Sequence, residues 1–222
     1  MTNLPVVCFL NPNSTESMTN TCQDTLDRIT VAAETRFEFI TNRGAPEAIQ
    51  GAEDGDLATK AMLSLVSELP HNYSAFVVGC FDDTGVWDLI EQVGRPVIGI
   101  GQAAYHWASL RSQRFVVLTT LAVSVPVIRE SIRRQGFEPQ CLDVVASGIP
   151  VLELERSPDQ SLKILNDCIR NIVQTYGQDV AVILGCAGMT DLYTDLAGQW
   201  DSLTIIDPVA AGLRLSGILC HG

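Results

Sequence analysis

The sequence predicts an α/β protein made of two pseudo-symmetric lobes, each a parallel sheet flanked by helices. Short runs of β-branched and other apolar residues alternate with helix-like segments along the 222 residues, which is typical of parallel sheets covered on both faces. Similar landmarks recur after about half of the chain, and cysteines or polar residues follow several expected strands. We therefore expect a functional site in the cleft between the lobes.

Three pairs of landmarks support an internal repeat. The pairs are Cys80 with Cys186, 98–104 with 205–211, and Asn11 with Thr119. Their separations of 106, 107 and 108 residues nearly agree, although the sequence identity between the halves is low. Self-similarity at a fixed period indicates a duplicated unit.

The first half is expected to begin with a strand at Val6–Leu10 and a helix that runs to about Ala33. Asn13 is the expected N-cap of that helix, with Glu16 in the capping-box position. Further strands are expected at 37–41, 75–79 and 97–100, helices at 58–69, 85–92 and 103–112, and a loop at 42–56.

The second half is expected to repeat this order of elements. Strands are expected at 115–119, 141–146, 180–184 and 203–206, and helices at 125–135, 159–176 and 191–198. Gly136 stands where a helix C′ glycine is expected. Asp207 and Pro208 are the expected N-cap and first residue of a final helix to about Leu219. We expect one lobe to comprise 1–100 plus the C-terminal helix 208–222, and the other 101–207.

Composition excludes several classes of partner. The formal net charge is −12 and the 14 basic residues form no runs, which argues against nucleic-acid binding. No apolar stretch is long enough to span a bilayer, and Met1–Pro5 has no basic signal-peptide region. Seven cysteines without CxxC spacing indicate a reduced, cytoplasmic protein. Three scattered histidines lack zinc-ligand spacing, so no metal is expected.

The two repeated cysteines are the strongest candidates for chemistry. Ligands bind outside the carboxyl ends of parallel strands, where Asn11, Cys80, Thr119, Thr120 and Cys186 are expected. Two thiols that face each other across a cleft suit proton removal from one face of a carbon and proton return to the other. A single cysteine after a strand is more often a small core residue, and the repeat is what favours the functional interpretation here.

Other candidates are weaker. Asp82 and Asp83 could form a metal or base pair, but acids at helix N-termini commonly serve as caps. His106 lies in an expected helix and is expected to be packed or exposed. The chain has no G-x-S-x-G element, P-loop or complete dinucleotide-binding fingerprint. The remaining cysteines carry no partner signal.

Four segments resemble the aspartate/glutamate/hydantoin racemase superfamily, and most closely its hydantoin and allantoin racemase branch. They are NPNSTESMT at 11–19, CFDDTG at 80–85, VLTT at 117–120 with SVPVI at 124–128, and LGCAGM at 184–189. The resemblance covers nearly the whole chain. It implies a cofactor-independent, two-lobed enzyme, and a homo-oligomer, in which Cys80 and Cys186 act as acid and base.

The resemblance also implies that backbone amides around Phe81–Asp82 and Ala187–Gly188 bind the carbonyls of a small cyclic ureide, allantoin or a 5-substituted hydantoin. Thr119 or Thr120 hydroxyls could add hydrogen bonds, and Asn11 could shape the pocket. Because both cysteines precede expected helices, we expect the helix dipole to lower the pKa of each thiol.

Alternative functions remain open at this point. An acyclic amino-acid racemase of the superfamily should place Arg or Lys near the cleft, and a decarboxylase or cis–trans isomerase would keep one cysteine. A binding protein would tolerate serine at both cysteine positions. A cysteine hydrolase would need a histidine partner.

Overall fold

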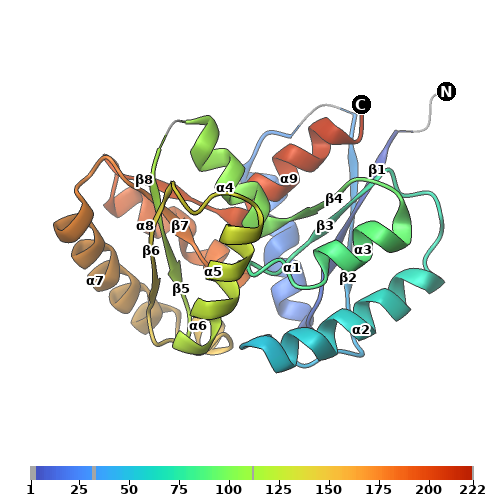
Figure 1. The fold of residues 1–222 in the computed structure, drawn as a ribbon, viewed down its shortest axis with the longest axis horizontal. Coiled ribbons are helices and arrows are strands. Elements are labelled where there is room, and N and C mark those ends of the chain that lie inside the picture. The colour runs from blue at the N-terminus through green and yellow to red at the C-terminus, as the bar shows by residue number, and fades with distance from the viewer. Residues whose placement is uncertain (1–3, 32–33, 112, 222) are drawn as a thin grey trace.

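The computed structural model describes residues 4–31, 34–111 and 113–221. It consists of two lobes, each built around a four-stranded parallel sheet (Figure 1). The first sheet contains β1 (Val6–Asn11), β2 (Arg36–Thr41), β3 (Ala75–Val78) and β4 (Val97–Gly99), and the second contains β5 (Phe115–Thr119), β6 (Cys141–Ala146), β7 (Ala181–Leu184) and β8 (Thr204–Ile206).

The two sheets share one topology. The strand orders are β2-β1-β3-β4 and β6-β5-β7-β8, and every pairing is parallel. In each sheet the first and third strands lie side by side in the centre, with Leu10 opposite Val78 and Leu118 opposite Leu184. The expected fold class and the internal repeat are therefore confirmed.

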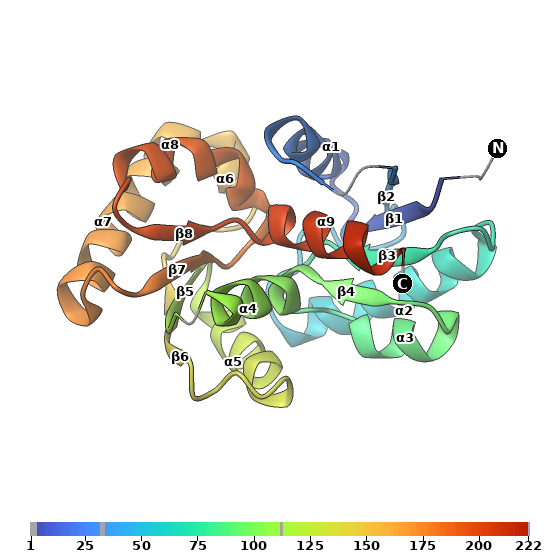
Figure 2. The same ribbon diagram turned by 90° about the horizontal axis from the view of Figure 1, so that it is seen from above.

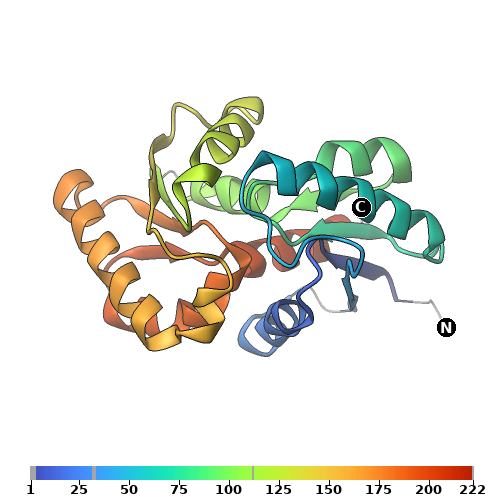
Figure 3. The same cartoon turned by 90° about the horizontal axis from the view of Figure 1, so that it is seen from below.

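Helices cover both faces of each sheet. The first half contains α1 (Glu16–Asp24), α2 (Ala52–Glu68), α3 (Val86–Val93) and α4 (Ile100–Leu110). The second contains α5 (Val125–Arg134), α6 (Glu153–Arg156), α7 (Pro158–Tyr176), α8 (Tyr193–Gln199) and α9 (Pro208–Leu219). Figure 3 shows α1 and α2 on opposite faces of the first sheet and α5 and α7 on opposite faces of the second.

Alternation along the strands explains these layers, because successive strand residues point to opposite faces. Val6, Cys8 and Leu10 pack in one cluster with Met62 and Val66 of α2. The intervening Val7 and Phe9 pack in another with Cys22 of α1. In the second sheet, Val116 and Leu118 pack with Leu165 and Ile169 of α7, and Phe115 and Val117 with Ile128 and Ile132 of α5.

Two helices, α4 and α9, lie side by side at the junction of the lobes (Figure 2). Val209 and Leu213 of α9 belong to the same buried cluster as Val7 and Phe9 of the first sheet. Ala104 and Tyr105 of α4 belong to a cluster of the second sheet. This packing supports the division into 1–100 plus 208–222 and 101–207, which we keep as a proposal.

The first helix differs from the sequence-based expectation. Thr15, not Asn13, is the N-cap of α1, and the α-helix ends at Asp24, followed by a 3-10 turn η1 (Thr25–Arg28). The expected end near Ala33 lies outside the described residues. Asn13 lies two residues before Thr15, and its side-chain oxygen accepts hydrogen bonds from the Thr15 backbone N–H and from Asn11 Nδ2 in the turn that precedes the helix.

Other element boundaries differ by less. Helix α2 begins at Ala52 rather than at 58, within the expected loop, and Asp54 accepts a hydrogen bond from the Gln50 backbone N–H just before it. The short helix α6 and the 3-10 turns η2 (Ala122–Ser124) and η3 (Ala187–Leu192) were not expected. Gly136 has φ 79°, as a C′ glycine should. Within the described residues, no helix is long and apolar enough to cross a membrane.

Candidate active site

A cleft with an empty volume of about 420 Å³ lies at the carboxyl ends of the central strands of both lobes. It is lined by Asn13, Met18, Ile49, Gly79, Cys80, Phe81, Asp82, Thr119, Thr120, Ser124, Ile128, Val151, Gly185, Cys186 and Ala187. Both predicted catalytic cysteines therefore reach one cavity, one from each lobe. Among the described residues that line it, none is Lys, Arg or His.

The glycines before the two cysteines bring the backbones of neighbouring strands close together. The Gly79 N–H donates to Leu10 O at 2.8 Å, and the Gly185 N–H donates to Leu118 O at 2.8 Å. A Cβ at Gly79 would lie 2.6 Å from Phe9 Cε1, and one at Gly185 would lie 2.8 Å from Val117 Cγ1. Only glycine fits at either place, so each cysteine leaves its strand at the same point of the repeat.

A carboxylate faces the first thiol. Cys80 Sγ donates a hydrogen bond to Asp82 Oδ1 at 2.9 Å. The same oxygen accepts hydrogen bonds from the Thr84 hydroxyl and from the Thr84 backbone N–H at 3.2 Å. Burial, followed by the charge of Asp82 and the hydrogen bond to it, raises the pKa of the Cys80 thiol well above its ordinary value.

Backbone amides face the second thiol. Burial raises the pKa of Cys186 to about 11, while hydrogen bonds from the backbone N–H groups of Gly188 and Met189 lower it. The expectation of a lowered pKa is therefore wrong at both cysteines, because burial raises the pKa of each thiol. At Cys186 the backbone N–H groups offset part of this rise, whereas at Cys80 the charge of Asp82 adds to it.

Asp83, the neighbour of Asp82, is buried and serves a different purpose. Its Oδ1 accepts the backbone N–H groups of Gly101 and Gln102 at the start of α4, and its Oδ2 accepts hydrogen bonds from Ser131 of α5 and from Gln135, which directly follows α5. Burial raises the pKa of Asp83 to about 7 in spite of these hydrogen bonds. The structural interpretation of this residue fits its contacts better than a metal or base pair with Asp82.

The second lobe contributes hydroxyls to the cleft. The Thr119 hydroxyl donates to Gly185 O at 3.1 Å and so ties the end of β5 to the Cys186 segment. Thr120 and Ser124 also line the cleft and are largely buried. Within the described part of the chain, their hydroxyls make no hydrogen bond to another protein group, which leaves them available to a ligand.

Most of the predicted binding residues lie in the cleft. Phe81, Asp82, Thr119, Thr120 and Ala187 line it together with the cysteines. Two others do not line it. The Gly188 N–H lowers the pKa of the Cys186 thiol, and Asn11 lies behind the wall, where its Nδ2 donates to Asn13 Oδ1, Thr15 O and Thr19 Oγ1.

Sequence reasoning missed part of the lining. Asn13, which follows the predicted Asn11, reaches the cleft, as do Met18 of α1 and Ser124. Their position in the segments 11–19 and 124–128 was the available signal. Ile49, Ile128 and Val151 add apolar walls, and nothing in the sequence marks Ile49 or Val151, because each reaches the cleft from an irregular segment.

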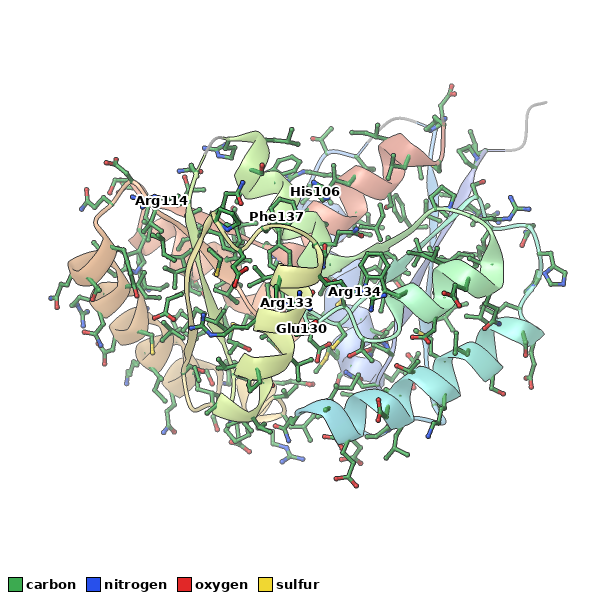
Figure 4. The ribbon with its side chains drawn as sticks, viewed as in Figure 1. His106, Arg114, Glu130, Arg133, Arg134 and Phe137 are labelled. Atoms are coloured by element: carbon green, nitrogen blue, oxygen red, sulfur yellow. The ribbon has the colours of Figure 1, made fainter. Side chains whose placement is uncertain are left out.

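His106 and the remaining cysteines lie elsewhere. His106 of α4 is exposed, and its ring packs edge-on against Phe137, with the ring centres 4.8 Å apart (Figure 4). Arg134 of α5 faces the first lobe (Figure 4), and its guanidinium carbon lies 4.4 Å from the ring centre of Trp87 of α3. Cys8 and Cys22 are buried in the core. Among the described residues, no group of three or more His, Cys, Asp or Glu is placed to hold a metal ion.

Comparison with known proteins identifies the family. The Asp/Glu/hydantoin racemase family model matches residues 7–216. A hydantoin racemase of Rhizobium meliloti is 34% identical over 212 residues, which cover 95% of this chain and 87% of the relative. The structure of an allantoin racemase from Pseudomonas fluorescens superposes with a TM-score of 0.89 at 25% identity, over 97% of this chain and 91% of that one.

An allantoin racemase from Klebsiella pneumoniae superposes with a TM-score of 0.87 at 28% identity, over 98% of this chain and 88% of that one. These similarities extend across both lobes and the cleft between them. The chain therefore belongs to the Asp/Glu/hydantoin racemase family and is an isomerase of the racemase type.

Proposed function

We propose that this enzyme racemises a five-membered cyclic ureide, either allantoin or a 5-substituted hydantoin, by proton transfer between Cys80 and Cys186 without a cofactor. The observation that carries the proposal is the convergence of two thiols from opposite lobes on one cleft. One thiolate removes the proton from the stereogenic carbon, and the other thiol returns a proton to the opposite face. The roles of the two cysteines exchange for the other enantiomer.

The carbanion formed in this reaction needs hydrogen-bond donors at the adjacent carbonyl oxygen. In the described part of the chain, no hydrogen bond uses the backbone N–H groups of Phe81 or Asp82, and the hydroxyls of Thr120 and Ser124 are also available. Each donor aimed at the developing charge contributes about 3–4 kcal/mol in comparable sites. These groups support the proposal that both lobes hold the ring.

The polarity of the cleft favours a neutral ring over an acyclic amino acid. An amino acid carries a carboxylate, and the described lining offers Asp82 but no Lys, Arg or His to balance that charge. Placing a carboxylate beside Asp82 without a cation would be costly in a partly buried site. The relatives named above are hydantoin and allantoin racemases, which agrees with this preference.

The test follows optical rotation of (S)-allantoin and, separately, of an L-5-substituted hydantoin, with dialysed enzyme under reducing conditions and no added cofactor. Decay to zero rotation with one of them supports the proposal and identifies the substrate. Parallel incubations with L-glutamate and L-aspartate test the amino-acid alternative. Constant rotation of both ureides, with enzyme that is folded and reduced, contradicts the proposal.

A further inference from the structure

We infer that the Asp82 carboxylate keeps the proton on Cys80, so that Cys186 is the cysteine that loses its proton first and that starts the reaction for one enantiomer. Asp82 then acts as a positioning residue that sets the resting protonation of the cysteine pair. The catalytic meaning of this inference rests on the proposed two-cysteine function, whereas the protonation of the thiols can be measured without any substrate.

The position of Asp82 is fixed by its neighbours. Its Oδ1 accepts the Cys80 thiol proton at 2.9 Å, and the hydroxyl and backbone N–H of Thr84 donate to the same oxygen. The Thr84 hydroxyl also donates to Cys80 Sγ at 3.7 Å, which lowers the pKa of that thiol but does not offset burial and the Asp82 charge. An ionised carboxylate accepts hydrogen bonds but cannot donate one. The hydrogen bond between Cys80 and Asp82 therefore forms only while the thiol carries its proton, and it is lost when the thiol is deprotonated.

The second lobe lacks this carboxylate. At the repeat distance of 106 residues, Gly188 occupies the place of Asp82 and Thr190 the place of Thr84. Thr190 turns away from the thiol and donates to Asp207 instead. The backbone N–H groups of Gly188 and Met189 follow Cys186 closely and lower the pKa of its thiol in part; the Met189 N–H itself donates to Cys186 O at 3.1 Å. The two thiols therefore differ in one partner: the Asp82 carboxylate accepts the Cys80 proton, and among the described residues no carboxylate contacts the Cys186 sulfur.

No charge in the surroundings reverses this difference. The titratable groups that interact with Asp82 are Cys80 beside it, Cys186 across the cleft, Asp83 next in the chain and Tyr105 of α4. All of them are neutral or negative when titrated, and the described cleft lining contains no cation. A nearby negative charge disfavours a second one, and at 2.9 Å from the sulfur this effect falls mainly on Cys80.

The proton count follows directly. The Cys186 thiolate forms an S–H bond with the substrate proton, and the C–H electron pair remains on the carbanion. The Cys80 S–H bond then breaks, and its proton forms the new C–H bond on the opposite face. The product leaves a Cys80 thiolate and a Cys186 thiol, and proton exchange with water restores the resting pair. Because the two enantiomers have equal free energy, the difference in protonation between Cys80 and Cys186 does not change the equilibrium between them. It is detected by measuring the two thiols themselves.

The experiment measures alkylation of each cysteine by iodoacetamide across the neutral and alkaline range, after removal of reductant. Peptide mass spectrometry quantifies Cys80 and Cys186 separately. Because thiolates are the reactive form, the pH dependence of each rate reports the protonation of that thiol independently of its accessibility. In the wild-type enzyme we expect Cys186 to become reactive at lower pH than Cys80.

Asp82→Asn should shift the pH dependence of Cys80 alkylation downward by about 1–3 units, the size expected for loss of an adjacent charge. At a fixed pH below the pKa of Cys80, a fall of one unit in that pKa raises the thiolate fraction about tenfold and lowers the intrinsic nucleophilicity of the thiolate about threefold. The alkylation rate should therefore rise about threefold for each unit. Asp82→Glu should restore the wild-type order. Asp88→Asn, which removes an exposed carboxylate of α3, is the matched control and should change neither rate.

Two results would overturn the inference. One is a wild-type enzyme in which Cys80 becomes reactive at lower pH than Cys186, a measurement that needs no variant to fold. The other is a folded Asp82→Asn variant whose Cys80 profile equals that of wild type. Failure of the optical-rotation assay with all substrates would refute the proposed function and leave the alkylation result intact, so the two failures are distinguishable.

Discussion

The helix after the last strand begins differently in the two lobes. In the second lobe, the N-cap of α9 is Asp207, whose own side chain accepts the backbone N–H groups of Val209 and Ala210. In the first lobe the N-cap of α4 is Gly99, which has no side chain. There the equivalent N–H groups, those of Gly101 and Gln102, donate to Asp83 from the cysteine segment.

Both helices need an acceptor for the backbone N–H groups of their first turn. In α9 the acceptor is the N-cap residue itself, and in α4 it is a residue distant in sequence. A Cβ at Gly99 would lie 1.9 Å from Asp83 Oδ1, so the carboxylate of Asp83 occupies the space of a cap side chain. Asp83 also accepts hydrogen bonds from Ser131 of α5 and from its C-cap residue Gln135. The segment that carries Cys80 is thereby connected to α4 and to the second lobe, whereas the cap of α9 involves no residue of α5.

The largest expected effect comes from replacing either of the two cysteines, one of which each lobe contributes to the cleft. Cys80→Ser and Cys186→Ser should each lower the racemisation rate by about 10²–10⁴-fold or more, because serine is a poor acid–base group near neutral pH. Initial rates from optical rotation measure this. Proton NMR in deuterium oxide should show that one variant still exchanges the substrate proton in one enantiomer. Racemisation at the wild-type rate by either variant would contradict the two-cysteine mechanism.

The next effect concerns Asp83 and the pH dependence of stability. Burial raises the pKa of Asp83 from 3.8 to about 7, so the folded state binds this proton more tightly than the unfolded state. The corresponding contribution to the free energy of unfolding is present below about pH 4 and is lost as the pH rises through about 7, on the order of 4 kcal/mol. Urea denaturation across this range measures it.

Asp83→Asn should remove this part of the pH dependence, and Asp88→Asn should retain it. The variant has a ready acceptor, since Gln135 Oε1 is buried without a hydrogen-bond partner in the described structure and the amide can be turned. Parallel stability–pH curves for wild type and Asp83→Asn would show that Asp83 titrates in the folded state much as it does in the unfolded chain.

A smaller effect tests the place of the cap directly. Gly99→Ala should lower the free energy of unfolding by about 3 kcal/mol, because its Cβ would displace the Asp83 carboxylate. Gly198→Ala is the control: no heavy atom lies within 4 Å of a Cβ at this residue of α8, and alanine should raise helix stability by about 1 kcal/mol. Equal effects of the two substitutions would contradict the role of Asp83 as the cap of α4.

The smallest expected effect tests the hydrogen bond between Ser131 of the second lobe and Asp83 of the first. Ser131→Ala removes the 2.9 Å hydrogen bond to Asp83 Oδ2 and should cost about 1 kcal/mol of unfolding free energy. Ser67→Ala, at an exposed hydroxyl that donates to Ser64 O, should change stability by about 0.5 kcal/mol or less. Thermal denaturation of both variants is the measurement, and a Ser131→Ala protein as stable as Ser67→Ala would argue that α5 gains nothing from Asp83.

Periodicity and local chemistry were sufficient for much of the fold. The alternation of strands and helices, the repeat, and the Asp207–Pro208 start of the last helix depend on residues close in sequence, and all are confirmed. The N-cap and the end of the first helix were predicted wrongly: the helix runs from Glu16 to Asp24 with Thr15 as its N-cap, and the Asn13 side chain holds the turn before it through Asn11 and Thr15. A residue with two possible partners is assigned correctly only when the distances to both are known.

The sequence by itself determined that two cysteines follow equivalent strands and that polar residues gather at those strand ends, because strand order and alternation are local properties. Only the tertiary structure decided which groups influence each thiol: the Asp82 carboxylate at Cys80 and backbone amides at Cys186. It also decided that Ile49 and Val151 line the cleft. Likewise, only the tertiary structure separated the neighbouring carboxylates, directing Asp82 to the thiol and Asp83 to α4 and α5. The physical reason is that burial of the thiols and the partners of Asp83 come from segments distant in sequence, and that the direction of the Asp82 side chain within its turn is set only in the folded structure.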